Sequence, residues 1–307
     1  MLTGGCQVAS HIALTPSARR LMMDIGAVWD DDIARHRDVV LNVYGEILRK
    51  SSNTGVSVTR DIPYGAHPRQ VLDCFVPDDA SNSPVMFFLH GGSFVGGCKR
   101  VTDEVYDNVL YWAARQGFVG INVEYRLAPE SVWPGGADDF ALALEWMQTN
   151  VSRYGGNPAS VFAMGHSAGG THLGTYAFDP AAAYFGRGLK GLVLLSPRMR
   201  ADALPENPFA GSVRSYFGAD DALYDARSPA THVGISMLPL MIAISEFENP
   251  LLDVYGLELA YRVASARRKA PRFIRLAGHN HISMIAHFNT CEDDLGQEIV
   301  AFTRYLM

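Results

Sequence analysis

A serine at position 167 occupies the apex of a glycine-rich turn. The sequence Gly-His-Ser-Ala-Gly-Gly at residues 165–170 follows the apolar run 161–164 and precedes a helix-compatible stretch. In a strand–turn–helix of this kind the glycines let the two backbones approach closely, and the serine hydroxyl faces the substrate. The N-terminus of the helix adds a positive partial charge near the reacting oxygen. The pattern predicts nucleophilic chemistry at Ser167, although an ordinary glycine-rich turn can carry the same residues.

A second glycine motif predicts the groups that stabilise a developing oxyanion. His-Gly-Gly-Ser-Phe at residues 90–94 directly follows the apolar run 85–89. Consecutive glycines let backbone N–H groups turn inward, where they can bind the oxygen of a tetrahedral intermediate together with the N–H of Ala168. The structural alternative is a glycine turn that lets strand and loop pass closely.

These two motifs and a third between them carry a family resemblance. Tyr-Arg-Leu-Ala-Pro-Glu occupies residues 125–130, and the order and spacing of the three motifs are similar to those of the hormone-sensitive-lipase-like esterases of the α/β-hydrolase fold. Ile-Pro-Tyr-Gly at residues 62–65, with Leu72-Asp73, resembles the neighbouring branch that contains kynurenine formamidases and small carboxylesterases. The resemblance covers roughly residue 57 to the C-terminus and is more specific for the fold than for the substrate.

The resemblance implies a role for each motif residue. Ser167 is the expected nucleophile, and the backbone N–H groups of Gly92, Ser93 and Ala168 are the expected oxyanion donors. The lipase-like family usually has a third glycine where this chain has Ser93, so the backbone donor is kept but a side chain enters the acyl pocket. We interpret Arg126 and Glu130 as members of structural ion pairs.

The acid of such a triad follows a later strand, because the fold uses the order serine, acid, histidine. Relatives commonly carry Glu-x-Asp-Pro at this place. Counting from the strand puts Glu248 at the position of the aspartate, whereas counting back from the proline puts Asn249 there, which cannot supply the negative charge that stabilises an imidazolium. We predict Glu248 as the acid, with Asp253 as the second candidate and Glu246 as the third.

Two histidines compete for the role of base. Gly-His-Asn-His-Ile-Ser at residues 278–283 follows the expected strand 272–276. The resemblance aligns His281 with the general base of the family, and His279 is the alternative. A histidine pair also suits a metal ion, but no third ligand with suitable spacing accompanies it. We predict no metal and no cofactor, and we expect His166 to point away from the reacting face.

Alternating strand and helix patterns must position these groups. From residue 84 onward the alternation implies an α/β-hydrolase fold with a mostly parallel central sheet, helices on both faces and a site at the carboxyl ends of the strands. The expected strands are 85–89, 118–123, 160–164, 189–195, 239–245 and 272–276, and the expected helices are 102–116, 136–150, 168–178, 250–268 and 293–305.

The N-terminal part has a different pattern. Two amphipathic helices are expected first, and two short strands, 56–62 and 70–76, follow with a hairpin-like turn between them. We therefore divide the chain into an N-terminal helical cap segment, 1–55, and a catalytic α/β-hydrolase domain, 56–307. Within the domain, the proline-rich interval of about 198–234 is too long for a plain connector and is expected to form a lid-like excursion.

Composition excludes several classes of partner. The chain has 307 residues, 48% hydrophobic and 19% charged, with a net charge of −6, which gives no reason to expect a nucleic-acid partner. No apolar run of eighteen residues and no signal-peptide pattern occur, so we expect no membrane partner and a cytoplasmic location. Four scattered cysteines, at positions 6, 74, 98 and 291, agree with a reducing compartment. A homodimer is one candidate assembly.

The leading hypothesis from the sequence is a serine carboxylic ester hydrolase. It would cleave small or medium acyl esters through a Ser-His-Glu triad and an acyl-enzyme, with a small-molecule ester as its substrate. One alternative is an aryl formamidase or other amidase of the kynurenine-formamidase type, because the same machinery cleaves amides. The other alternative is a non-catalytic ligand-binding protein on the same fold.

Overall fold

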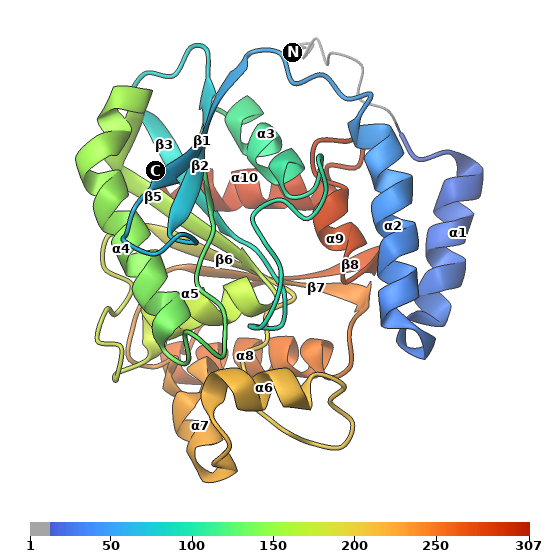
Figure 1. The fold of residues 1–307 in the computed structure, drawn as a ribbon, viewed down its shortest axis with the longest axis vertical. Helices are drawn as coiled ribbons and strands as arrows, with labels where there is room; N and C mark the ends of the chain where they lie inside the picture. The colour runs from blue at the N-terminus through green and yellow to red at the C-terminus, as the bar shows by residue number, and fades with distance from the viewer. Residues whose placement is uncertain (1–12) are drawn as a thin grey trace.

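The centre of the protein is a twisted eight-stranded sheet (Figure 1). The computed structural model describes residues 13–307, so Cys6 and the start of the expected cap segment lie outside the described residues. The strand order is β1-β2-β4-β3-β5-β6-β7-β8. β2 is antiparallel to both of its neighbours, and all other pairs are parallel. The strands are β1 (Val56–Pro63), β2 (Val71–Pro77), β3 (Ser83–Leu89), β4 (Val119–Val123), β5 (Gly156–His166), β6 (Gly191–Leu195), β7 (Leu240–Phe247) and β8 (Arg272–Asn280).

Helices cover both faces of this sheet, and the strand residues alternate between two buried cores. In β3, Met86 and Phe88 belong to one core, whereas Phe87 and Leu89 belong to the other. This is the two-residue period of a strand that is buried on both faces. The mostly parallel sheet with helices on both faces, as predicted from the sequence, is confirmed. The first core includes residues of α1 (Pro16–Ala27), α2 (Ile33–Leu48), α3 (Asp107–Arg115), α9 (Ser283–Ala286) and α10 (Asp294–Leu306), and the second includes residues of α4 (Gly135–Asn150), α5 (Ala168–Phe178) and α8 (Leu252–Arg267).

The two N-terminal helices pack beside the end of the sheet formed by β7 and β8 (Figure 1). The Thr15 side chain caps α1 by accepting from the N–H of Ala18 at 3.1 Å, and Asp32 caps α2 in the same way. Gly26 allows the close approach of α1, because a Cβ there would lie 2.2 Å from the ring of Phe247. α1 therefore packs directly against the strand that precedes the expected acid, whereas α2 packs against α9.

Several expected elements differ from those observed. β5 (Gly156–His166) is longer at both ends than the expected strand 160–164. The helix expected at 102–116 begins only at Asp107, because the Thr102 hydroxyl accepts from the N–H of Val105 at 3.0 Å and holds a turn there. β8 continues to Asn280, since its pairing with β7 resumes after an irregularity. The interval 198–234 is folded, with α6 (Ala210–Phe217), α7 (Tyr224–Arg227) and short 3-10 turns.

Candidate active site

Ser167 forms the whole connection between β5 and α5. Its backbone has φ 53° and ψ −119°, a conformation that is costly for a residue with a side chain and is typical of strained functional turns. The N–H of Ser167 donates to the carbonyl oxygen of Leu195 on the neighbouring strand β6 at 2.9 Å. The turn is thereby fixed at the carboxyl end of the sheet, and Ser167 lines a cavity of ≈ 230 Å³ there.

The loop after β3 reaches the same cavity with an unusual backbone. Gly92, Ser93 and Phe94 have φ values of 140°, 51° and 72°. A Cβ at Gly92 would lie 2.0 Å from the carbonyl oxygen of Gly96, so only glycine fits this position. Within residues 13–307, no acceptor is recorded for the N–H groups of Gly92 and Ser93, and both residues line the cavity. These amides are therefore available to a ligand.

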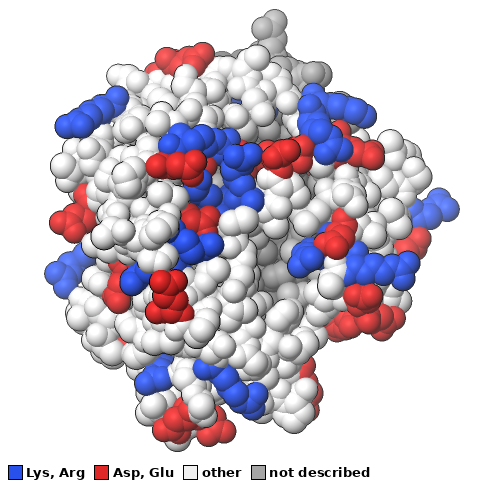
Figure 2. All heavy atoms as spheres, viewed as in Figure 1, with Lys and Arg blue, Asp and Glu red and all other residues white. Residues whose placement is uncertain are grey.

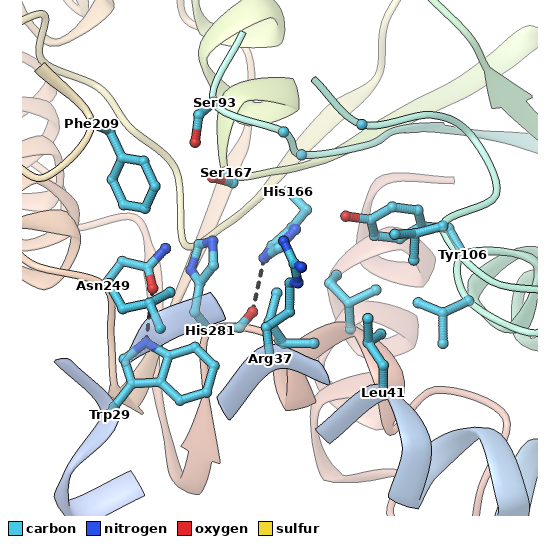
Figure 3. Close-up of a pocket in the computed structure, with 18 residues that line it drawn as sticks. Trp29, Arg37, Leu41, Ser93, Tyr106, His166, Ser167, Phe209, Asn249 and His281 are labelled. Atoms are coloured by element: carbon cyan, nitrogen blue, oxygen red, sulfur yellow. Dashed lines mark hydrogen bonds between the residues drawn. The ribbon is translucent and has the colours of Figure 1, made fainter. Parts of the chain in front are cut away.

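His281 and Glu248 meet in a buried pair at the ends of β8 and β7. The Nδ1 atom of His281 lies 2.9 Å from Oε2 of Glu248. The other carboxylate oxygen accepts from the Ser196 hydroxyl and, at 2.7 Å, from the N–H of Ser245. Burial alone would raise the pKa of Glu248, but the charge of His281 and these hydrogen bonds outweigh it and hold the pKa below its ordinary value. The imidazole extends into the cavity that Ser167 lines (Figure 3).

The other two acid candidates have different partners. Asp253 is exposed in the first turn of α8, where it accepts from the N–H of Val254 at 2.8 Å. Glu246 accepts from the N–H of Gly278 at 2.7 Å, and this bond lowers the pKa of its half-buried carboxylate. Among the described residues, the acid that contacts His281 is Glu248. Neither Asp253 nor Glu246 does so.

The alternative base also lies elsewhere. The Nδ1 atom of His279 is 3.2 Å from the Ser283 hydroxyl, and its ring lies 4.7 Å from that of His287. His281 lines the cavity and His279 does not. Residues 13–307 contain no group of three or more His, Cys, Asp or Glu side chains that could hold a metal ion.

His166 occupies a position that the sequence analysis assigned wrongly. It lines the cavity, its Nε2 atom lies 3.0 Å from the carbonyl oxygen of His281, and the two rings are 4.5 Å apart (Figure 3). The reason is the strand period, since His166 shares a face of β5 with Met164, on the side of the sheet where α9 packs. Burial and the charge of His281 hold the pKa of His166 well below its ordinary value.

Arg126 forms an ion pair, as interpreted from the sequence, whereas Glu130 contacts a histidine, and neither residue lines the cavity. Arg126 pairs with the buried carboxylate of Asp139 at 2.7 Å, and Glu130 pairs with His67 at 3.0 Å. The two residues therefore tie loops to the domain, each with its own partner. Because neither side chain lines the cavity, we assign the chemistry to the residues described above.

The second wall of the cavity comes from α2 and from Trp29 just before it. This part of the expected cap segment was not predicted to line the site. Trp29 precedes α2, and its Nε1–H donates to Oδ1 of Asn249 at 2.8 Å, beside the expected acid (Figure 3). Ile33, Arg37 and Leu41 of α2 also line the cavity. Successive members of this set are four residues apart, which places them along one helix face. This four-residue spacing is visible in the sequence, but it is equally typical of a helix face that packs in the hydrophobic core.

Proteins similar in sequence to this chain include several that are named as esterases. The BD-FAE family matches residues 72–178. Esterase LipC of Mycobacterium tuberculosis is 35% identical over 120 residues, which are 38% of this chain and 29% of LipC. Para-nitrobenzyl esterase of Bacillus subtilis is 32% identical over 172 residues, 50% of this chain and 32% of that protein. The chain thus spans about a third of the length of these curated relatives.

Solved structures match over nearly the whole chain. A bacterial heroin esterase superposes with a TM-score of 0.70 at 22% identity and covers 94% of this chain and 98% of its own. An esterase from the archaeon Pyrobaculum calidifontis gives a TM-score of 0.69 at 20% identity, covering 96% and 99%. The chain has the α/β-hydrolase fold. Its similarity is to proteins named as esterases and carboxylesterases.

The surface around the site is mixed in charge. Figure 2 shows acidic and basic side chains interspersed over one face of the molecule, which is hollowed near its centre. Across residues 13–307, we find no helix with the length and hydropathy that a bilayer crossing needs.

Proposed function

We propose that the protein is a serine carboxylic ester hydrolase for small or medium acyl esters. The observation that carries the proposal is the buried His281–Glu248 pair, whose imidazole enters the same cavity as the strained Ser167. A general base must be oriented and must face its nucleophile. The bond to Glu248 supports the first condition, and the cavity shared with Ser167 supports the second. The names of the relatives support the same activity.

In the proposed mechanism, the proton of Ser167 passes to Nε2 of His281 as the serine oxygen attacks the ester carbonyl. Glu248 accepts from Nδ1–H, which fixes the tautomer and offsets the charge of the imidazolium. The N–H groups of Gly92, Ser93 and Ala168 stabilise the oxyanion. The imidazolium then protonates the leaving alcohol. In the second half of the reaction, water attacks the acyl-enzyme while His281 takes its proton, and His281 returns that proton to Ser167 as the carboxylic acid leaves.

We also propose that α1 and α2 act as a cap over this site and that the interval 198–234 contributes a lid-like wall. Trp29 and Leu41 line the cavity from the first segment, and Phe209 lines it from the second. Both segments lie outside the alternation of strands and helices that builds the sheet. Their place at the cavity suits a role in substrate selection.

The test is covalent labelling combined with two substrates. A fluorophosphonate probe should label the native protein and not Ser167→Ala, and the native protein should hydrolyse p-nitrophenyl acetate. No labelling of the native protein would favour a non-catalytic binding protein. Turnover of N-formylkynurenine without turnover of the ester would instead identify an aryl formamidase.

A further inference from the structure

A single basic side chain enters the proposed active-site cavity from α2. Arg37 lines the cavity, and Figure 3 shows its guanidinium extending from the helix toward His166. Its side chain is 49% exposed, so the charge lies at the mouth and stays within reach of an entering molecule. This placement distinguishes Arg37 from Arg35 of the same helix, which is exposed and does not line the cavity.

The ion pair of Arg37 is one that a ligand can replace. Its recorded partner is the adjacent residue Asp38, at 2.9 Å, whose side chain is 63% exposed. An exposed pair of this kind contributes little, because water and salt screen both charges. A carboxylate bound inside the cavity would be better shielded from water and could take both arms of the guanidinium fork.

The cavity itself supplies no negative charge to balance Arg37. Among the described residues that line it, none is Asp or Glu, and Arg37 is the one Lys or Arg. The nearby carboxylate of Glu248 is already engaged by His281, Ser196 and Ser245. The remaining lining is mostly apolar or glycine, so the positive charge faces a surface that lacks a counter-ion.

We propose that Arg37 forms an anion subsite and that the preferred substrates are esters carrying a carboxylate on the acyl or the alcohol part. This inference rests on the proposed esterase function. Because Arg37 and Ser167 border the same cavity of ≈ 230 Å³, one small molecule can reach both. The apolar residues of the lining would hold the chain between the scissile bond and the carboxylate.

The experiment compares matched charged and neutral esters. For the acyl part, the pair is mono-4-nitrophenyl adipate and 4-nitrophenyl hexanoate. For the alcohol part, the pair is 4-acetoxybenzoate and 4-acetoxybenzamide. In at least one pair, Arg37→Gln should lower the ratio of kcat/KM for the charged ester to that for the neutral ester by about tenfold or more, the usual effect of losing a charge-assisted hydrogen bond. Arg35→Gln is the matched control and should leave both ratios unchanged.

Two further measurements keep the test decisive. If Arg37→Gln does not fold, raising NaCl from about 0.05 to 0.5 M with the native protein should lower the charged-to-neutral ratio, because salt screens a half-exposed cation. Ratios that are insensitive to salt and to Arg37→Gln, or that fall equally in Arg35→Gln, would overturn the anion subsite. If the native protein hydrolysed none of the four esters, this result would instead count against the esterase function.

Discussion

The two walls of the cavity are built in different ways. One wall, called the catalytic wall because it carries the proposed catalytic residues, lies at the carboxyl ends of β3, β5, β7 and β8. Its backbone is strained at Ser167 and in the loop around Gly92. The opposite wall is one face of a regular helix, α2, preceded by Trp29. Chemistry requires fixed positions for a few atoms, so it depends on rare backbone conformations. Recognition requires only side chains of suitable shape and charge, which a regular helix can present.

The largest loss of activity is expected when the proposed acid, Glu248 on the catalytic wall, is replaced. Glu248→Gln should lower kcat by about 10³- to 10⁴-fold, because a neutral amide neither stabilises the imidazolium nor enforces the correct tautomer of His281. The fold should be kept, since the amide has nearly the same shape. Steady-state kinetics with p-nitrophenyl acetate and a circular-dichroism spectrum measure the two quantities.

Asp253→Asn is the matched control for that prediction. Asp253 is exposed and hydrogen-bonded within its own helix, so its replacement should change kcat by less than about threefold. If Asp253→Asn were the more damaging of the two variants, the assignment of the acid would be wrong.

A smaller loss is expected from the oxyanion loop. Gly92→Ala places a Cβ 2.0 Å from the carbonyl oxygen of Gly96 at φ 140°, so the loop must move and its N–H groups lose their alignment. We expect kcat to fall by about 10²- to 10³-fold, the effect of losing one such donor. Gly96→Ala is the control, because its Cβ would meet its nearest neighbour at 3.7 Å. Equal losses in both variants would argue against a specific role of Gly92.

The proposed catalytic wall could be singled out from the sequence because it depends on local motifs, and its catalytic role stays a prediction. The turn at Ser167 and the loop at Gly92 need glycines at fixed spacing, and these can be recognised without a structure. His166 was misplaced, because the end of β5 had to be known before its face could be assigned. The role of Trp29 could not be predicted, since its hydrogen bond to Asn249 joins residues 220 positions apart.

Acid should destabilise the protein through its buried histidines. Burial lowers the pKa of His172 and of His287 to about 3, and that of His166 well below its ordinary value. As the pH falls below about 6.5, the unfolded chain takes up protons that the folded protein cannot, so stability is lost between about pH 6.5 and 3. At pH 5, His172 and His287 each lower the stability by about 2 kcal/mol.

Urea unfolding at pH 7 and pH 5 measures this loss. The difference in unfolding free energy between the two pH values should shrink by about 2 kcal/mol in His172→Gln, because glutamine has no proton to take up. The variant serves as its own control, since any packing defect is present at both pH values. A difference that stays at the native value would show that His172 does not contribute to acid sensitivity.

The smallest effect on activity is expected at the junction of the two walls, where Trp29 donates to Asn249. Trp29→Phe removes the indole N–H that donates to Asn249 and leaves that buried oxygen unpaired, so the free energy of unfolding should fall by about 1 to 2 kcal/mol. Because Trp29 also lines the cavity, KM should rise several-fold and change more than kcat. Trp146→Phe is the control, since Trp146 packs on Tyr154 and does not line the cavity. A rise in KM of the same size in Trp146→Phe would argue against recognition by Trp29. A fall in kcat in Trp29→Phe as large as that of Glu248→Gln would mean that the helical wall takes part in the chemistry. Either result would contradict the contrast between a wall for recognition and a wall for catalysis.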